Sequence, residues 1–337
     1  MTAPSKENQG EPRPDAARSD AGRPSAARPK VPRRLLDGVL LLDKPVGLSS
    51  NDALIRAKRL YRVKKAGHTG TLDPLASGLL PLCFGEATKF SQDLLEADKT
   101  YEATMRLGIR TATGDAEGEA IETREVSCDE AAVREAMTRF LGDIVQVPPM
   151  YSALKRDGKP LYDSARAGQT VEREGREVKI LALEMIACAL PAVPEVTFRV
   201  TCSKGTYVRT LAEDIGEALG CGAHLVMLRR TGVGALTLEH AVTLDALTAA
   251  AEPERDTWLR PVDALLSTFP AVTLNVEAAR RFTHGQRLPL NELVLDRAVC
   301  EAAERVRVYA EDGRLLGVAK AANGVLAPER LVVSGAA

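Results

Sequence analysis

The segment at residues 67–81, "GHTGTLDPLASGLLP", holds one carboxylate, Asp73, in a run that carries no other acid and no Lys or Arg. It directly follows the basic run "RAKRLYRVKK" at residues 56–65. Asp-Pro is a common turn opener and Asp often caps helices, so a purely local role explains this acid. The alternative is a catalytic carboxylate on a stiff loop beside a surface that binds a polyanion. The segment alone does not decide between the two.

The chain has 337 residues, enough for two domains, and 45% of them are hydrophobic, enough for a sizeable core. Its formal net charge of −1 hides an uneven distribution, because residues 1–34 carry eight basic and four acidic side chains. This segment is rich in Pro, Ala, Ser and Gly, so we expect a disordered basic tail that serves as a linker or holds a polyanion weakly. Any nucleic-acid argument therefore depends on local patches.

The six cysteines form no C-x-x-C pair and the four histidines are scattered, so the sequence predicts no metal site. Reduced, partly buried thiols in a cytosolic protein are the simplest interpretation. No apolar run is long enough to cross a membrane, and the N-terminus lacks the apolar core of a secretory signal. We therefore expect a soluble, cytoplasmic protein.

Order is expected to begin at Gly38–Leu42, a continuous apolar run that is typical of a buried strand and that Pro45 ends. Ser49 or Ser50 then caps a helix that has Asp52 in its first turn. This helix leads into the basic run, which makes the helix the first candidate for an electrostatic surface.

The basic run at residues 56–65 contains no acid. Most charge runs are solvated helix faces, and that is one interpretation here. The other is a phosphate-contacting surface, because clustered Lys and Arg supply the salt-dependent part of nucleic-acid binding. For that role the candidates are Arg59, Lys64 and Lys65.

Further elements follow from periodicity and turn signals. We expect strands at 100–110, 178–190, 195–203 and 224–234, and helices at 129–142, 206–220 and 244–265. Ser127 and Glu130 fit a capping box for the first of these helices, which Gly142 would close. The polar, basic segment at about 148–176 is expected to be a surface insertion.

After Pro270 the sequence changes to short strands and Gly turns. Asp312-Gly313 and Asn323-Gly324 are hairpin signals. We therefore expect a small β-rich domain of about sixty-five residues, near the lower limit for independent folding.

Several catalytic signatures are absent. The sequence has no P-loop, no strand-borne G-x-G-x-x-G, no G-x-S-x-G elbow and no H-E-x-x-H. The sequence thus lacks the motifs that are typical of nucleotide hydrolysis, S-adenosylmethionine-dependent transfer and metal-dependent hydrolysis. What remains is cofactor-free chemistry by a carboxylate next to a polyanion surface.

Six blocks carry a resemblance to a known family: "GVLLLDKPVGLSSNDAL", "AGHTGTLDPLASGLLPLCFGEATKF", "KTYEA", "MYSALKRDGKPLY", "CSKGTYVRTLAEDIGEALGCGAHLVMLRR" and "GVLAPERLVV". From about Gly38 onward the chain resembles the bacterial tRNA pseudouridine synthase B family. The resemblance implies an α/β (α+β) pseudouridine synthase fold with a mixed, mainly antiparallel sheet, and a C-terminal PUA-like β-barrel module. Residues 1–34, the expected tail, lie outside the resemblance. The resemblance implies a catalytic domain at 35–265 with an RNA-gripping insertion at about 148–176, and an RNA-binding domain at 266–337.

The resemblance makes Asp73 the catalytic nucleophile. A carboxylate that attacks carbon forms a covalent intermediate, which splits one hard step into two easier ones. Whether Asp73 attacks C1′ of the ribose or C6 of the uracil stays open. The resemblance also implies that Tyr101 stacks on the target base and can transfer a proton, and that Arg209 pairs with Asp73 and keeps it ionised and aimed.

Other positions carry over in the same way. Tyr207 and Leu228 resemble residues that line the uracil pocket, and His68 resembles the histidine that enters the RNA loop. Lys44 and Pro45 resemble supports of the catalytic loop.

The implied activity is isomerisation of the uridine at position 55 in the T loop of tRNA, with the base flipped out of the RNA and without a cofactor. The implied partner is the T stem-loop, read by shape and phosphates. We expect a monomer that needs no protein partner. A tRNA-binding folding chaperone with secondary catalysis is the alternative function, and a synthase acting on another RNA is a further one.

Overall fold

The structure is a computed structural model that describes residues 32–152, 155–156, 159–160, 171–293 and 303–333. The predicted tail at 1–34 lies almost wholly outside the described residues, and so does much of the predicted insertion. Within the described part of the chain, no helix is long and apolar enough to cross a membrane.

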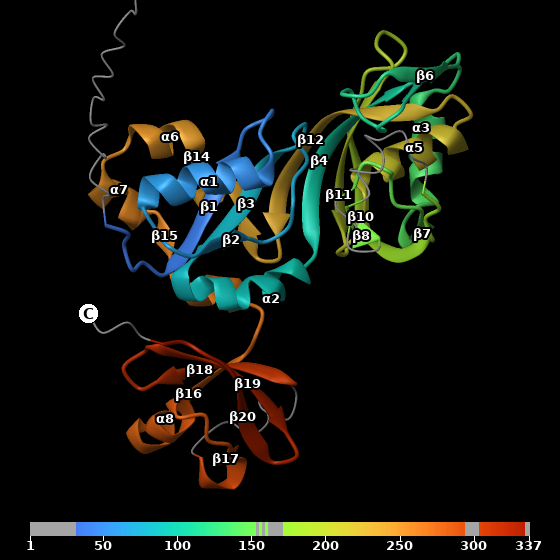
Figure 1. Ribbon diagram of the computed structural model, residues 1–337. Coiled ribbons are helices and arrows are strands. Elements are labelled where there is room, and N and C mark those ends of the chain that lie inside the picture. The colour runs from blue at the N-terminus through green and yellow to red at the C-terminus, as the bar shows by residue number, and fades with distance from the viewer. Residues whose placement is uncertain (1–31, 153–154, 157–158, 161–170, 294–302, 334–337) are drawn as a thin grey trace, which may run out of the picture. The chain divides into compact units, whose positions relative to one another are not determined.

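Most of the described strands join one sheet of eleven strands (Figure 1). Its strands are β1 (Gly38–Lys44), β2 (Ala66–His68), β3 (Ser77–Phe84), β4 (Lys99–Leu107), β7 (Gly142–Gln146), β10 (Arg176–Cys188), β11 (Glu195–Cys202), β12 (Ala223–Val233), β13 (Leu236–Thr237), β14 (Val242–Thr243) and β15 (Leu259–Arg260). The main path runs β14-β1-β3-β12-β4-β11-β10-β7. Among the described pairs of this sheet, β1 with β14 and β3 with β12 are parallel and the others antiparallel. The predicted mixed, mainly antiparallel sheet is confirmed.

The apolar run Gly38–Leu42 of β1 is buried on both faces of the sheet. Leu40 and Leu42 belong to one hydrophobic cluster, while Val39 and Leu41 belong to another. Strand β11 shows the opposite pattern: buried residues alternate with partly or fully exposed ones. One face of β11 therefore packs on the core and the other does not.

Helix α1 (Ser50–Tyr61) begins as the sequence predicts. The side chain of Ser49 accepts a hydrogen bond of 3.1 Å from the Asp52 backbone N–H. Ala53, Ala57 and Tyr61 form the buried side of the helix, in the same cluster as β1. This packing fixes the N-terminal end of α1 against the loop that follows β2.

The capping box predicted for the next long helix is wrong. Helix α3 (Glu130–Thr138) is capped by Asp129, whose Oδ1 accepts a 2.9 Å hydrogen bond from the Ala132 backbone N–H. Asp caps as well as Ser, and its charge also suits the helix dipole, so the cap nearer the first turn prevails. Gly142 does not close this helix, because it is the first residue of β7.

The long helix predicted at 244–265 is also wrong. The segment contains α6 (Leu244–Ala249), α7 (Glu252–Thr257), strand β15 and the 3₁₀ turn η3 (Val262–Leu266). Pro253 lies in the first turn of α7, and Pro261 precedes η3. Proline restricts the residue before it and has no N–H to donate to a helical hydrogen bond, so each one starts a new element.

Helix α5 (Val208–Ala218) packs on the sheet through Leu211, Ala212 and Ile215. Gly220 follows its C-cap with a left-handed φ of 80°, the conformation that favours glycine there. Helix α5 matters for the site because its N-cap is Tyr207 and its first turn carries Arg209, two of the predicted site residues.

The buried carboxyl of Asp214 on α5 predicts a pH-dependent stability. Burial raises the pKa of Asp214 to about 6, with a smaller contribution from Glu217. A carboxyl with a raised folded-state pKa contributes most to stability below its unfolded pKa, and this contribution is lost as pH rises through about 6. We expect Asp214→Asn to raise the unfolding temperature more at pH 8 than at pH 4. Equal shifts at both pH values, measured by thermal unfolding, would contradict this.

The C-terminal part contains a second, five-stranded sheet in the order β16-β18-β19-β20-β17. Its elements are β16 (Ala271–Leu274), α8 (Val276–Thr283), β17 (Leu288–Pro289), β18 (Arg305–Ala310), β19 (Leu315–Ala322) and β20 (Val325–Leu331). It has its own hydrophobic cluster, to which Phe282, Val306 and Leu326 belong. Both predicted hairpin turns join consecutive strands, with left-handed φ values of 80° at Gly313 and 73° at Gly324. The predicted small β-rich module is thus confirmed.

The remaining elements are short. They are the 3₁₀ turns η1 (Gly85–Phe90), η2 (Leu238–His240) and η4 (Leu290–Glu292), helix α2 (Ser91–Leu95), the hairpin of β5 (Ile109–Thr111) and β6 (Ala120–Thr123), and the ladder of β8 (Lys155–Arg156) and β9 (Lys159–Pro160). The loop inside the β5–β6 hairpin reaches the candidate site.

Candidate active site

The loop at 69–76, between β2 and β3, carries Asp73 and is held from several sides. Ser50 at the start of α1 is bonded through its Oγ to the Leu72 N–H at 2.7 Å and to the Leu72 carbonyl at 3.0 Å. The loop also contains a turn, in which the Ala76 N–H donates to the Asp73 carbonyl at 3.1 Å. The local interpretation of this Asp-Pro segment is therefore correct, and the turn is what fixes the carboxylate.

Asp73 forms an ion pair with Arg209, as the resemblance predicts. Arg209 Nη2 lies 2.8 Å from Asp73 Oδ2. The Arg209 side chain is only 6% exposed, whereas that of Asp73 is 41% exposed. The carboxylate therefore keeps an open side on which a substrate atom can approach.

Arg209 is itself tightly held. Its Nη1 donates to the Thr113 carbonyl at 2.9 Å and its Nη2 to the Tyr151 carbonyl at 2.8 Å. A second carboxylate, Asp115 in the β5–β6 loop, lies 3.4 Å from Arg209 Nη1 and is 4% exposed. Sequence reasoning missed Asp115, because it falls in a Gly/Thr-rich turn whose position beside α5 no local pattern reveals.

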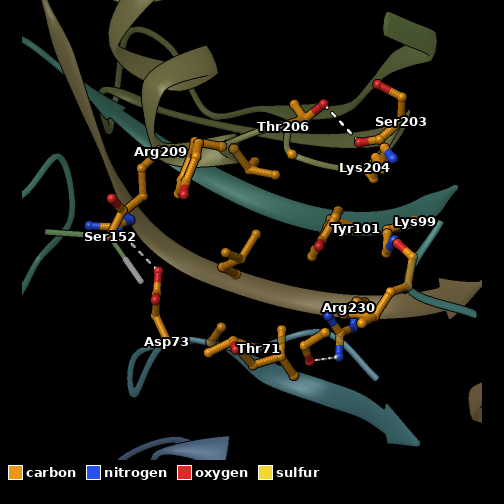
Figure 2. A pocket seen from close by; sticks show the side chains of 18 residues that line it. Thr71, Asp73, Lys99, Tyr101, Ser152, Ser203, Lys204, Thr206, Arg209 and Arg230 are labelled. Atoms are coloured by element: carbon orange, nitrogen blue, oxygen red, sulfur yellow. Dashed lines mark hydrogen bonds and ion pairs between the residues drawn. The ribbon is translucent and has the colours of Figure 1, made fainter. Parts of the chain in front are cut away.

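The pair lies at one end of a cavity of about 240 Å³ (Figure 2). Tyr101 on β4, Leu228 on β12 and Tyr207 at the start of α5 line the same cavity. Three elements that are far apart in the sequence thus meet at one hollow. Five of the six predicted catalytic and base-binding residues are brought together there.

The two tyrosines of the cavity, Tyr101 and Tyr207, are partly buried. Burial raises the pKa of Tyr101, and the charge of Arg230 opposes this shift. Burial also raises the pKa of Tyr207. Both phenols are therefore neutral at physiological pH, and each can donate a proton or a hydrogen bond.

His68 lies on a different but adjoining hollow, of about 550 Å³, that shares Asp73 and Arg209 with the cavity. Burial lowers the pKa of His68, and the positive charge of Arg230 lowers it further. A neutral imidazole at the mouth of the site suits stacking or hydrogen bonding more than phosphate binding. The buried Nδ1 of His68 has no hydrogen-bond partner within the described residues.

The loop support predicted for Lys44 is visible in its contacts. Its Nζ donates to the Pro45 carbonyl at 2.9 Å and to the Leu48 carbonyl at 2.7 Å. Burial lowers the pKa of Lys44 to about 8, while the negative charge of Asp73 raises it. Lys44 thus fixes the turn that enters α1 and places a positive charge on the side of Asp73.

The three candidates for RNA backbone contact, Arg59, Lys64 and Lys65, are exposed and line neither hollow. Arg62, in the same basic run, is partly neutralised by Glu252 at 2.6 Å. Lys64 and Lys65 have no carboxylate within ion-pair distance among the described residues. They therefore keep the charge that a phosphate would need.

Replacing Lys64 and Lys65 with Ala is expected to weaken binding of tRNA and to flatten its salt dependence by about one slope unit per lost phosphate contact. The maximal rate at saturating RNA should change little, because neither lysine reaches the cavity. A suitable control replaces two exposed arginines, Arg134 in α3 and Arg139 at its C-cap, which pair with acids one helical turn away. If binding titrations of the lysine variant give an unchanged salt slope, the basic run is only a solvated helix face and does not contact phosphates.

The described residues contain no group of three or more His, Cys, Asp or Glu side chains that could hold a metal ion. The site instead consists of a carboxylate–guanidinium pair above a cavity with aromatic and apolar walls. This arrangement suits a class of enzyme in which a side-chain carboxylate attacks a substrate held in a cavity.

Comparisons with known proteins identify the family. Residues 58–208 match the TruB family pseudouridylate synthase N-terminal domain, residues 209–267 the tRNA pseudouridylate synthase B C-terminal domain, and residues 270–332 the pseudouridine synthase II TruB C-terminal domain. The chain belongs to the TruB family of pseudouridylate synthases.

The similarity extends over most of the chain. The chain is 79% identical over 306 residues to tRNA pseudouridine synthase B of Burkholderia pseudomallei (strain 668), covering 90% of this chain and 99% of that protein. It is 65% identical to the protein of the same name from Cupriavidus pinatubonensis, covering 90% and 96%. A solved chain described as "Crystal Structure of a Cbf5-Nop10-Gar1 Complex" is 28% identical, with a TM-score of 0.66, covering 87% of this chain and 84% of that one.

Proposed function

We propose that this protein isomerises a uridine of tRNA to pseudouridine, at position 55 of the T loop. The observation that carries the proposal is the Asp73–Arg209 ion pair of 2.8 Å at the end of a cavity lined by Tyr101 and Leu228, in a chain of the TruB family. Relatives that are 79% and 65% identical to this chain bear the name tRNA pseudouridine synthase B.

The residues divide into roles. Asp73 is the nucleophile, and Arg209 pairs with it and keeps it directed into the cavity. Tyr101 stacks on the uracil, and Tyr207 and Leu228 form the other walls of its pocket. The cavity encloses one base, so the target nucleotide must leave the folded RNA loop, and stacking and hydrogen bonds in the pocket offset a cost of a few kcal/mol.

The RNA outside the cavity is held by other parts of the chain. His68 contacts the nucleotides next to the flipped one, and Arg59, Lys64 and Lys65 contact phosphates. We assign residues 35–265 to catalysis and residues 266–337 to a PUA-like module that binds RNA. We assign to the insertion at about 148–176, together with the basic run, the role of gripping the stem and loop of the RNA.

The test uses a tRNA transcript labelled with tritium at C5 of its uridines. Isomerisation replaces the C5–H bond by a C5–C1′ bond, so the label passes to water. We expect release of one tritium per transcript, and none when the uridine at position 55 is replaced by cytidine. Release from the cytidine transcript would refute the position, and no release from either transcript would refute the activity.

A further inference from the structure

Two buried cations lie at the end of the cavity away from Asp73. Arg230 on β12 is 1% exposed and Lys99 at the start of β4 is 7% exposed, yet both line the cavity. Figure 2 shows Asp73 and Arg209 at one end, and Lys99 and Arg230 beside Tyr101 at the other. Strand pairing explains this arrangement, since Arg230 is the register partner of Tyr101.

Backbone oxygens, not acids, hold both cations. Arg230 Nε donates to the Leu79 carbonyl at 2.8 Å and its Nη2 to the Gly70 carbonyl at 3.1 Å. Lys99 Nζ donates to the Leu95 carbonyl at 2.6 Å and to the Ala97 carbonyl at 2.5 Å. Among the described residues, neither has a carboxylate within ion-pair distance. A buried charge without a counter-ion is costly, so it calls for a negative partner that is present only at some stage of the cycle.

The adjacent residue, Arg229, has an acidic partner, unlike Arg230. Arg229 points to the other face of β12, where its Nη2 lies 2.7 Å from Asp43 Oδ2. Two adjacent arginines on one strand thus have opposite environments: one is neutralised by an acid and the other is kept free of one. The position of Arg230 is also fixed by its backbone, because a Cβ at Gly78 would come within 2.2 Å of the Arg230 carbonyl oxygen.

The reaction supplies such a negative partner, whichever carbon Asp73 attacks. If the carboxylate bonds to C1′, the C1′–N1 bond breaks and its electron pair stays on the uracil, which becomes an anion. If the carboxylate adds to C6, the electron pair of the C5–C6 bond moves to C5 and O4. In both routes the ring carries negative charge that reaches O4. Both candidate carbons, C1′ and C6, are bonded to N1, so the N1 edge of the ring faces Asp73. O4 lies on the opposite side of the ring and therefore points to the far end of the cavity.

We propose that Arg230, assisted by Lys99, is an electrostatic site for the uracil anion, which stabilises the negative charge that the ring gains when Asp73 attacks. Pre-oriented donors that face developing charge in a site shielded from water are among the largest contributions to catalysis. Burial lowers the pKa of Lys99 to about 8, and the charge of Arg230 adds to that shift, so an approaching anion restores the full charge of the lysine. The inference rests on the proposed function and adds to it two residues, Arg230 and Lys99, that stabilise the negative charge on the uracil ring.

The test compares Arg230→Gln, which keeps a donor for one carbonyl but loses the charge, with Arg230→Lys, which keeps the charge. The readout is single-turnover tritium release at saturating tRNA. We expect a loss of about 100-fold for Arg230→Gln and about tenfold for Arg230→Lys. The matched control, Arg229→Gln, should stay within about twofold of the wild-type rate. Equal losses for Gln and Lys would reduce Arg230 to a support of the Gly70 and Leu79 carbonyls and would overturn the proposal.

A second measurement uses tRNA with 5-fluorouridine at the target position, followed as the loss of the N-linked base. Fluorine stabilises negative charge on the ring, so the reaction depends less on Arg230. The wild-type rate divided by the Arg230→Lys rate should therefore be smaller with 5-fluorouridine than with uridine. This comparison holds even if Arg230→Gln does not fold. A ratio that is the same for both bases would overturn the proposal, because a merely positional role affects both equally. If the wild-type protein and Arg229→Gln release no tritium, the proposed function is what fails.

Discussion

Asp73→Asn is expected to lower pseudouridine formation by at least about four orders of magnitude, while tRNA affinity changes by less than about tenfold. Asparagine fills the same space and can still bond to Arg209, but its neutral amide oxygen is a poor nucleophile. The Asp73 side chain is 41% exposed, so its replacement leaves no unpaired buried group and should preserve the fold. Single-turnover tritium release measures the rate, and filter binding measures the affinity.

The matched control for Asp73 is Asp43→Asn. Asp43 is also a carboxylate paired with an arginine, Arg229, at 2.7 Å, but it does not line the cavity. We expect this variant to keep most of the wild-type rate. Turnover of Asp73→Asn close to that of Asp43→Asn would show that the Asp73 carboxylate does not attack the substrate.

The residues alone predicted the parts of the fold that depend on local pattern. The apolar run in β1 became a strand buried on both faces, and Ser49 became a helix cap. The predictions that failed concerned competing local signals. Asp129 displaced the capping box two residues before it, and Pro253 divided a segment whose apolar periodicity suggested one helix.

The site could be predicted only where a resemblance supplied the long-range contact. The ion pair of Asp73 with Arg209 joins a loop and a helix that are 136 positions apart, and the resemblance predicted it correctly. Asp115 and Arg230 were missed for the same physical reason. Asp115 lies in a glycine-rich turn, and only the placement of the β5–β6 hairpin brings it beside Arg209. Arg230 is one of two adjacent arginines, and only the register of β12 decides which of the two enters the cavity.

Arg209→Leu is expected to lower activity by about three orders of magnitude and the free energy of unfolding by about 3 kcal/mol. Activity falls because Asp73 loses the group that directs it into the cavity. Stability falls because Asp115, 4% exposed, becomes a buried carboxylate without its arginine, and the Thr113 and Tyr151 carbonyls lose their donor. Single-turnover rates and urea unfolding measure the two effects.

The two effects of Arg209→Leu can be separated by a second substitution. Adding Asp115→Asn removes the stranded charge, so the double variant should regain much of the stability but none of the activity, because Asp73 still lacks its partner. Arg209→Lys keeps one charge but cannot bridge both carboxylates, so its rate should lie between those of wild type and Arg209→Leu. The exposed basic run is unchanged in all three variants, so each should still bind tRNA and assist its refolding if the protein also acts as a chaperone. A double variant that recovers activity together with stability would mean that Arg209 serves the fold alone, and that Asp73 needs no partner to attack.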